Sequence, residues 1–358
     1  MWQRQSRRIQ WVLLAALGVV LVGVTLWLAG RDAGLTAVRS THFVMDTVLE
    51  QTVYTAGEAS GEAVTSEAAR VVTGMENRLS AYREGSEILA ITEAAGDHPV
   101  AVSDETMALL ERAVEAGDRT GGLFDITLYP LTTLWGIGGE DFHPPEADAI
   151  AGRLEKVDYR TLQLDPEAGT AYLPEAGQGI DLGGIGKGAA LDRLQAFYRA
   201  SGVEHAIVSM GGNILAMGGR PDGDSFRVAL RDPSGQDASV GTLRMREGIL
   251  STSGGYERYS EWDGERYHHI LDPRTGYPAE SDLWSASVLG ENGADCDWQS
   301  TWLFVLGQEE ARRQAETLGL SAILIGKDGR VELFGDAVQL FTLQSEHFVL
   351  QTGGPTGA

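Results

Sequence analysis

The stretch on which the fold depends is Gln178-Gly-Ile-Asp-Leu-Gly-Gly-Ile-Gly-Lys-Gly-Ala-Ala-Leu-Asp192. Apolar residues on both sides of Asp181 predict a short strand, and apolar side chains at three- and four-residue steps then predict a helix. Glycines at such a turn let the backbone approach a ligand closely, and a helix N-terminus attracts anions. With the charge of Lys187, the stretch favours a phosphate-binding loop, although a simple tight turn has the same pattern.

The spacing of the glycines excludes two common types of nucleotide site. A P-loop has a glycine four residues before Gly-Lys-Ser/Thr, whereas here Asp181 takes the first glycine position and Gly188 follows the lysine. A Rossmann fold has an acidic residue at the end of the next strand, but the strand predicted at residues 205–210 is followed by Gly-Gly-Asn. A nucleotide bound here must therefore be held in another way.

Residues 1–31 are predicted to form a signal anchor, an N-terminal transmembrane helix. Arg4, Arg7 and Arg8 precede an uncharged apolar run at residues 11–30, which has about the length that a spanning helix needs. The positive-inside rule places the N-terminus in the cytoplasm and the rest of the chain on the extracytoplasmic side of the cytoplasmic membrane. A cleaved signal peptide is the alternative.

After a linker at residues 32–40, the sequence predicts one large domain at residues 41–345 and a C-terminal tail at 346–358. The net charge of −23 argues against nucleic acid as a partner. Cys296 is the single cysteine of the chain, which excludes an internal disulfide and a cysteine-based metal cluster.

Strand and helix patterns alternate irregularly, which favours a two-lobed mixed α/β domain of the α+β class over a doubly wound sheet. Strands are expected near residues 41–54, 205–210, 226–230, 241–245, 284–289, 322–325 and 331–334. Helices are expected near residues 64–79, 103–117, 189–202, 297–306 and 311–318.

Polar residues gather beside glycine turns at four places: Asp125, Asp181 with Lys187, His268-His269 with Asp272, and Asp297 with Ser300 and Thr301. Asp297 and Thr301 are four residues apart, so on a helix they share a face and offer two hard oxygen ligands for Mg²⁺. The alternative is that Asp297 caps a helix N-terminus.

His269 has a side chain that titrates near working pH, so it is a candidate general base, although a histidine beside a strand is more often structural. Asp272-Pro273 is compatible with a simple turn. By pattern alone, Met45 and Tyr82 are expected to fill the core.

The chain resembles the ApbE-type FAD:protein FMN transferases, the flavin transferase family. Any one of the matching motifs is weak, but together they follow the family's order over about residues 40 to 345. The motifs are Met45-Asp46-Thr47, Ser86-Glu87, residues 121–125, 130–136, 181–188, 209–213, 251–254, 269–276 and 303–307, and Asp297 with Thr301.

The resemblance implies an enzyme that binds FAD and Mg²⁺ and transfers FMN through a phosphoester to a threonine of a partner protein, with release of AMP. The partner would be an exported or membrane protein, such as a subunit of a membrane redox complex. By position, the FAD site would be lined by Met45, Tyr82, Leu123, Phe124, Asp125, Asp181, Lys187 and Leu271. The resemblance assigns metal ligands to the Gly184 carbonyl and the side chains of Asp297, Thr301 and Ser300, and the role of base to His269.

Two departures from the family pattern stand out. Thr92 takes a position at which relatives often have Asn, and Ser300 lacks a carboxylate. Two other functions are compatible with the same site: hydrolysis of FAD to FMN and AMP by water, and non-enzymatic flavin binding at the membrane.

Overall fold

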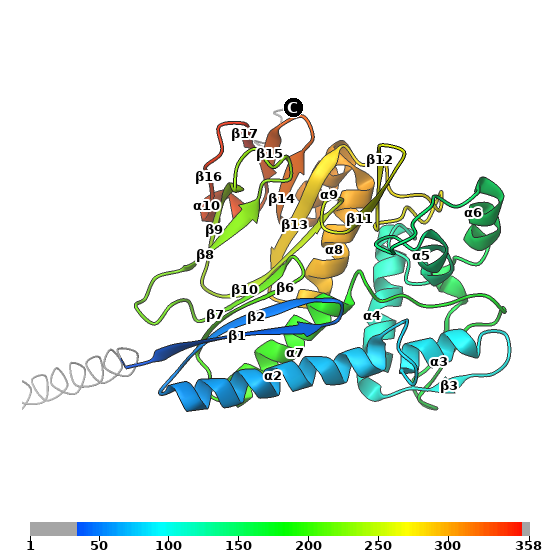
Figure 1. The fold of residues 1–358 in the computed structure, drawn as a ribbon, viewed down its shortest axis with the longest axis horizontal. Coiled ribbons are helices and arrows are strands. Elements are labelled where there is room, and N and C mark those ends of the chain that lie inside the picture. Colours follow the sequence, from blue (N-terminus) through cyan, green and yellow to red (C-terminus); the bar gives the residue numbers. More distant parts are fainter. Residues whose placement is uncertain (1–33, 353–358) are drawn as a thin grey trace, which may run out of the picture.

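The computed structural model describes residues 34–352, in which nine strands form one large mixed sheet (Figure 1). Neighbouring strands are antiparallel except for β15 and β17, which run parallel. In spatial order the strands are β1 (Thr36–Val44), β2 (Thr47–Thr55), β6 (His205–Met210), β7 (Asn213–Met217), β10 (Gly248–Gly254), β13 (Leu283–Gly290), β14 (Ser321–Gly326), β15 (Arg330–Leu333) and β17 (Val349–Thr352). This arrangement confirms the predicted mixed α/β architecture.

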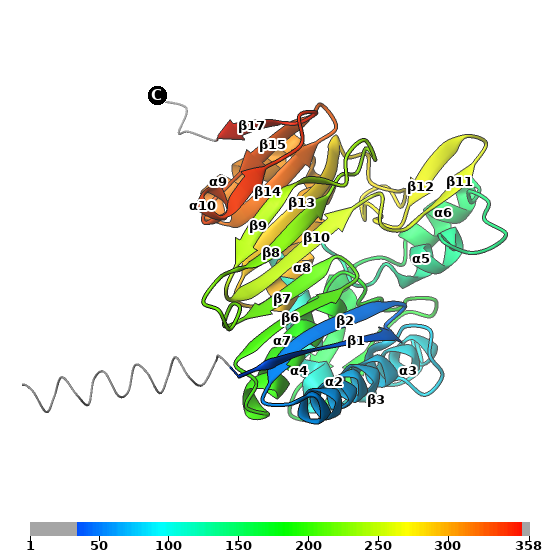
Figure 2. The same cartoon turned by 60° about the vertical axis from the view of Figure 1, so that its left-hand side comes forward.

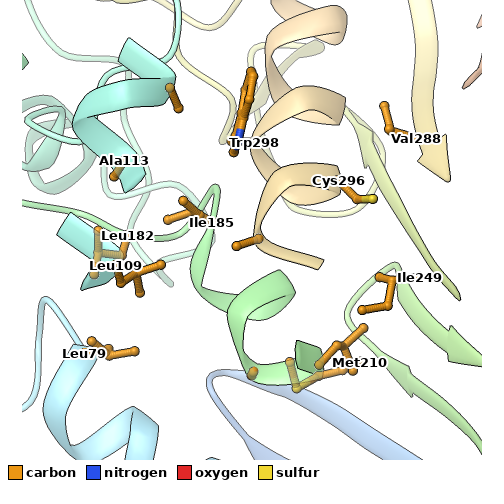
Figure 3. Packing of buried hydrophobic residues seen from close by; sticks show 14 of the residues in the cluster. Leu79, Leu109, Ala113, Leu182, Ile185, Met210, Ile249, Val288, Cys296 and Trp298 are labelled. Carbon is orange, nitrogen blue, oxygen red and sulfur yellow. The ribbon is translucent and has the colours of Figure 1, made fainter. Parts of the chain in front are cut away.

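Helices cover one face of the large sheet. They are α2 (Glu58–Leu79), α7 (Gly186–Ala200), α8 (Gly293–Leu306) and α9 (Gln308–Leu318). The main hydrophobic core lies between these helices and the sheet, and Figure 3 shows Ile185, Ile249 and Trp298 among its side chains. The glycine-rich stretch enters this core just before α7, so packing fixes its position.

A smaller sheet packs on the opposite face, over a second apolar cluster that includes Phe226, Leu243 and Ile323. Figure 2 shows this layer in front of β10 and β13. Its elements are β8 (Phe226–Arg231), β9 (Ser239–Met245) and β16 (Phe341–Leu343), with α10 (Ala337–Leu340) beside them.

The remaining elements gather beside one end of the large sheet in both views (Figures 1 and 2). Trp135 and Leu131 anchor part of them in a third apolar cluster with Leu271. The elements are α3 (Glu87–Glu93), β3 (Val100–Ala101), α4 (Asp104–Thr120), α5 (Tyr129–Trp135), α6 (Ala147–Leu154), a 3-10 turn (Tyr159–Thr161), β4 (Gln163–Asp165), β5 (Thr170–Tyr172), β11 (Tyr259–Trp262) and β12 (Glu265–His268).

Two sequence predictions about strands were wrong. Residues 41–54 form parts of two paired strands, because Met45 and Asp46 adopt φ values of 50° and 55° and turn the chain back tightly. Such turns favour Gly and Asn, so Met-Asp gave no turn signal. The strand expected around Asp181 is absent, because residues 178–182 pair with no strand. The Asp181 N–H donates to the Ile126 carbonyl, and the Ile180 N–H donates to the Thr92 hydroxyl.

The large sheet includes residues on both sides of the domain predicted at residues 41–345. β1 begins at Thr36 and β17 ends at Thr352. Within residues 34–352, no helix combines the length and apolar character needed to cross a membrane. The anchor predicted at residues 1–31 lies outside the described residues.

Candidate active site

A pocket of about 400 Å³ lies where the end of the large sheet meets the loop before α5. Among the residues that line it are most of those predicted for the site: Met45, Tyr82, Leu123, Phe124, Asp125, Asp181, Gly184, Lys187, His269, Leu271 and Thr301. The volume is typical of a small-molecule site. Asp297 and Ser300 do not line the pocket, because both are buried behind it.

The glycines of the central stretch are needed for close packing. A Cβ on Gly184 would lie 2.9 Å from the ring of Phe124 and 3.6 Å from Oγ1 of Thr301. A Cβ on Gly188 would lie 2.0 Å from the carbonyl oxygen of Gly293. The loop therefore brings the start of α7 against α8, and its backbone against the Thr301 hydroxyl.

Asp181 is held at the pocket wall by three donors. Its Oδ1 accepts the N–H of Gly183 at 2.8 Å, and its Oδ2 accepts the hydroxyls of Tyr82 at 3.0 Å and Thr132 at 3.1 Å. Desolvation, and then the negative charge of Asp181, raise the pKa of Tyr82 above its ordinary value. Tyr82 is therefore a neutral hydrogen-bond donor at the pocket rim, where its ring faces Tyr129.

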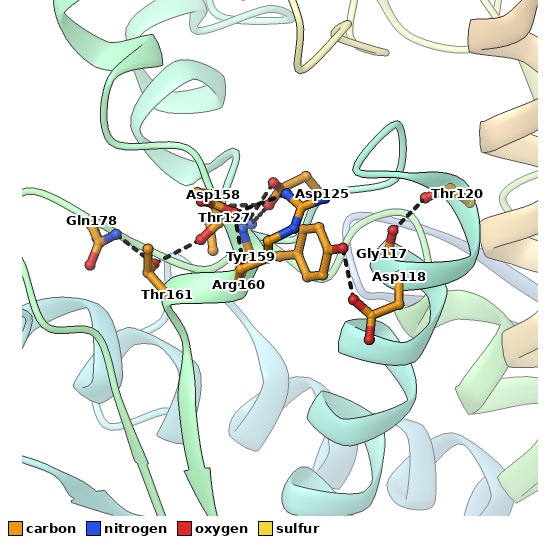
Figure 4. A network of polar contacts seen from close by, with 10 residues as sticks. All are labelled: Gly117, Asp118, Thr120, Asp125, Thr127, Asp158, Tyr159, Arg160, Thr161 and Gln178. Carbon is orange, nitrogen blue, oxygen red and sulfur yellow. Dashed lines mark hydrogen bonds and ion pairs between the residues drawn. The ribbon is translucent and has the colours of Figure 1, made fainter.

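Asp125 lines the pocket, but its carboxylate accepts hydrogen bonds from other residues of the chain (Figure 4). It accepts the N–H and hydroxyl of Thr127, at 2.7 and 2.6 Å, and the N–H of Tyr159 at 3.0 Å. Burial raises its pKa despite these bonds. Asp125 therefore shapes the loop that carries Leu123 and Phe124.

His269 points one ring nitrogen at a carbonyl and leaves the other without a bond to the chain. Its Nδ1 lies 3.0 Å from the carbonyl oxygen of Arg258. A carbonyl oxygen only accepts, so Nδ1 carries the proton and Nε2 holds the lone pair of the neutral ring. Nε2 is thus the atom that can accept a proton in the pocket.

The surroundings of His269 keep its ring neutral. Solvent reaches the side chain through the pocket, yet protein atoms surround it densely on the other sides. This burial, followed by the positive charges of Lys187 and Arg258, lowers the pKa of His269 to about 4. The ring is therefore unprotonated at neutral pH.

The other members of the histidine cluster have structural roles. His268 donates from Nε2 to the carbonyl of Ala279 and packs its edge on Phe304, and burial lowers its pKa. Asp272 accepts the N–H of Arg274 at 2.8 Å and pairs with its guanidinium group, as expected of a turn.

Asp297 caps a helix, but not its own. The N-cap of α8 is Asn292, whose side chain accepts the N–H of Asp295, so the prediction that Asp297 caps α8 was wrong. Instead its Oδ2 accepts the N–H of Gly188 in the first turn of α7 at 2.8 Å. Its Oδ1 lies 3.9 Å from Nζ of Lys187, the nearest cation to the carboxylate among the described ion pairs.

The oxygen atoms near Asp297 fit a hard divalent cation. The hydroxyl of Ser253 lies 2.8 Å from that of Ser300 and 3.0 Å from that of Thr301. Ser300 is fully buried and also donates to the Asp297 carbonyl, so it faces Ser253 and not the pocket. Within residues 34–352, no three His, Cys, Asp or Glu side chains gather as a metal cluster. One carboxylate with hydroxyl and carbonyl oxygens suits Mg²⁺, which keeps waters or phosphate oxygens as further ligands.

Trp298 and Cys296 flank Asp297 on α8. Trp298 is buried, with its ring 6.2 Å from that of Phe124, and it donates from Nε1 to Asp295. It therefore backs the pocket wall that Phe124 forms. Burial raises the pKa of the Cys296 thiol to about 12, so this side chain is an apolar part of the core.

Several pocket residues were missed by sequence reasoning. Arg258 binds the Ile137 carbonyl and presents its own carbonyl to His269, and Ser253 and Thr132 place hydroxyls at the pocket. Ser253 lies in a matching motif, but no spacing rule singles out these residues. Thr92 accepts the N–H of Ile180, so it supports the loop before Asp181 from outside the pocket.

Comparisons with known proteins place the chain among relatives of one family. The model of the ApbE family matches residues 45–324. The chain is similar to the FAD:protein FMN transferase of Treponema pallidum, with 33% identity over an alignment that covers 94% of this chain and 97% of that protein. A Klebsiella pneumoniae FAD:protein FMN transferase is 35% identical over 271 residues, 75% of this chain and 83% of that protein.

Two solved structures are similar in fold. The ApbE protein of Thermotoga maritima has a TM-score of 0.78 at 28% identity, covering 85% of this chain and 98% of that one. The flavin transferase ApbE from Vibrio cholerae has a TM-score of 0.74 at 26% identity, covering 82% of this chain and 94% of that one.

Proposed function

The chain belongs to the ApbE family, and we propose that it is a Mg²⁺-dependent FAD:protein FMN transferase. It would attach FMN through a phosphoester to a threonine of an exported or membrane protein and release AMP. The observation that carries this proposal is the meeting, in one pocket, of His269 with the Lys187 ammonium and the Thr301 hydroxyl beside Asp297.

The transfer step needs a base for a weak nucleophile. The threonine oxygen forms a bond to the FMN phosphorus of FAD, and the bond from that phosphorus to the bridging oxygen breaks. The hydroxyl proton passes to Nε2 of His269, and AMP leaves with the bridging oxygen. The Arg258 carbonyl keeps Nδ1 protonated, so Nε2 stays available for this proton.

The phosphates of FAD need positive charge. Lys187 donates to the Gly183 carbonyl at 3.0 Å and lies beside Asp297, so it can place its ammonium on a phosphate oxygen. Asp297, Thr301 and the Gly184 carbonyl would hold Mg²⁺, with Ser300 behind them. When bound, this ion neutralises the pyrophosphate charge and the charge that develops on the leaving oxygen. The apolar residues Leu128, Ile137 and Leu271 provide a wall suited to a flat ring.

Hydrolysis of FAD is the second candidate, because solvent reaches His269 through the pocket. Water in the place of the threonine would give free FMN and AMP. The two reactions differ in product, since transfer leaves flavin fluorescence on a protein after denaturation.

We further propose that residues 1–31 anchor the enzyme in the inner membrane, with the catalytic domain on the periplasmic side. The basic start and the apolar run of residues 11–30 support this location.

The function is tested in a strain from which this gene is deleted. The wild-type gene should restore fluorescent protein bands on a denaturing gel, and His269→Gln should not. His98→Gln is the matched control, because His98 is exposed and pairs only with its neighbour Asp97. Bands restored equally by His269→Gln would remove His269 as the base, and free FMN without bands would favour hydrolysis.

A further inference from the structure

The turn between β1 and β2 carries an exposed apolar pair next to the pocket. Phe43 and Val48 lie directly opposite each other in the strand register, and their side chains are 72% and 46% exposed. Phe43 is the most exposed large hydrophobic residue in the described part of the chain. Such a side chain is stabilised when a partner removes it from water.

The turn that carries the pair is tight. The pair Val44 and Thr47 closes the ladder, so only Met45 and Asp46 connect the strands, both with positive φ. A positive φ strains the backbone of a residue that carries a side chain. The strained turn holds Met45 at the pocket wall and fixes Phe43 and Val48 outside it.

The turn between the two strands lines the pocket, because Met45, Asp46 and Thr47 are among the lining residues. Thr47 lies against Gly211, where an added Cβ would be 2.9 Å from its Oγ1. The same Cβ would be 3.2 Å from Cδ of Lys187, and Lys187, Gly211 and His269 all line the pocket. An acceptor segment whose threonine lies at His269 would therefore leave the pocket beside Gly211 and Thr47, and Thr47 precedes Val48 in the chain.

We propose that Phe43 and Val48 are the docking site for the acceptor polypeptide, which places an apolar side chain on them beside the threonine to be modified. This rests on the transferase function proposed above. That function requires a protein segment at the pocket mouth, and these two side chains give it an apolar anchor.

The position of the pair disfavours a membrane surface as its occupant. β1 starts at Thr36, and the seven residues from there to Phe43 span about 24 Å in an extended strand. Figure 1 shows the turn at the opposite end of the hairpin from the point where the described chain begins. The net charge of −23 also disfavours contact with an anionic bilayer.

The test uses the full-length protein and synthetic peptides. Each peptide has one threonine in a Gly-Ser background and one leucine up to four residues before or after it, and a peptide without leucine is the reference. The wild type should prefer one leucine position by about tenfold in kcat/KM, the factor expected for about 1.4 kcal/mol of apolar contact. Phe43→Thr combined with Val48→Thr should lose this preference.

The substitutions to threonine keep β-propensity, so the hairpin should persist. Binding of FAD and its cleavage without peptide should be unchanged in the double variant, which separates this proposal from the function of the pocket. Val349→Thr is the matched control, because Val349 is 65% exposed on β17, at the other edge of the sheet. This control should keep the leucine preference.

Three results would overturn the proposal. The first is a wild type that cleaves FAD but shows no leucine preference or modifies no peptide. The second is a preference that survives in the double variant. The third is a double variant whose only change is weaker binding to vesicles of anionic lipid, or loss of a dimer, which would assign the pair to a membrane or to a second copy of the chain.

Discussion

The carboxylates of Asp192 on α7 and Asp297 on α8 each accept N–H groups at the start of the other's helix. Asp192 of α7 accepts the N–H groups of Gly293 and Ala294, at 2.6 and 3.0 Å, at the start of α8. Asp297 of α8 accepts the N–H of Gly188 in the first turn of α7. Each helix thus caps the other, and carboxylates at helix N-termini are favourable. The two bonds from Asp192 hold the start of α8, the helix that carries Asp297.

Replacement of Asp192 tests this link. Asp192→Ala removes two bonds to N–H groups of α8, so we expect the free energy of unfolding to fall by about 1–3 kcal/mol. We also expect Mg²⁺ to bind about tenfold more weakly, because Asp297 loses its support. Chemical denaturation and a Mg²⁺ titration measure the two effects. Asp192→Asn keeps one acceptor oxygen, so its stability and its Mg²⁺ affinity should lie between those of the wild type and Asp192→Ala. If both variants kept the wild-type stability and Mg²⁺ affinity, the result would contradict a role of Asp192 in holding α8.

Gly188 should tolerate no side chain. A Cβ there would lie 2.0 Å from the Gly293 carbonyl oxygen and 2.7 Å from Cβ of Asp297. We expect Gly188→Ala to lower the free energy of unfolding by about 3 kcal/mol or more, as overpacking against backbone does. The control is Gly74→Ala in α2, where the nearest atom is 3.9 Å away and about 0.5–1 kcal/mol of stabilisation is expected. Equal melting temperatures for the two variants would argue against the close contact.

Asp297→Asn tests the metal site. The substitution preserves shape but removes the negative charge, so we expect Mg²⁺ affinity and Mg²⁺-dependent FAD cleavage to fall by about 100-fold or more. Circular dichroism should show an intact fold. Asp295→Asn is the neighbouring control, because Asp295 pairs with Arg112 and Trp298 outside the pocket. Full Mg²⁺-dependent activity in Asp297→Asn would remove Asp297 from the metal site.

The pH dependence of transfer should reflect the low pKa of His269. The neutral ring is the active form, and its pKa of about 4 lies below the ordinary value of 6.5. The kcat/KM for the acceptor should therefore stay level as pH falls from 8 to 6 and decline only below about 5. An acid limb centred near pH 6.5 would show that the ring titrates normally.

The same shift affects stability with a definite sign. Between pH 6.5 and 4 the unfolded chain binds a proton that the folded chain excludes, so stability falls as pH falls through this window. His268, whose pKa is also lowered by burial, acts in the same direction. The variant His269→Gln should lose less stability between pH 7 and 5 than the wild type does.

Much of the helical part of the fold could be predicted from the sequence. The helices expected near residues 64–79 and 103–117 are α2 and α4, and the Ser103 hydroxyl caps α4 by accepting the N–H of Thr106. Such signals are local. The turn at Met45 and Asp46 was missed because tertiary contacts, and not residue preference, hold its backbone in place.

The candidate site was predicted mainly through the family resemblance. The spacing on α8 correctly put Asp297 and Thr301 on one face. It could not show that the Asp297 carboxylate accepts the N–H of Gly188 at the start of α7. Arg258 contributes a backbone carbonyl, and any residue type offers one, so the sequence holds no signal for that contact.

The most direct test of the proposed chemistry combines the full-length protein with FAD, Mg²⁺ and the threonine peptides described above. We expect flavin to appear on the peptide in a form that survives denaturation, with one AMP released per FMN transferred. Chelation of Mg²⁺ should abolish both products. A protein that, saturated with Mg²⁺, neither binds FAD nor cleaves it would contradict the proposal.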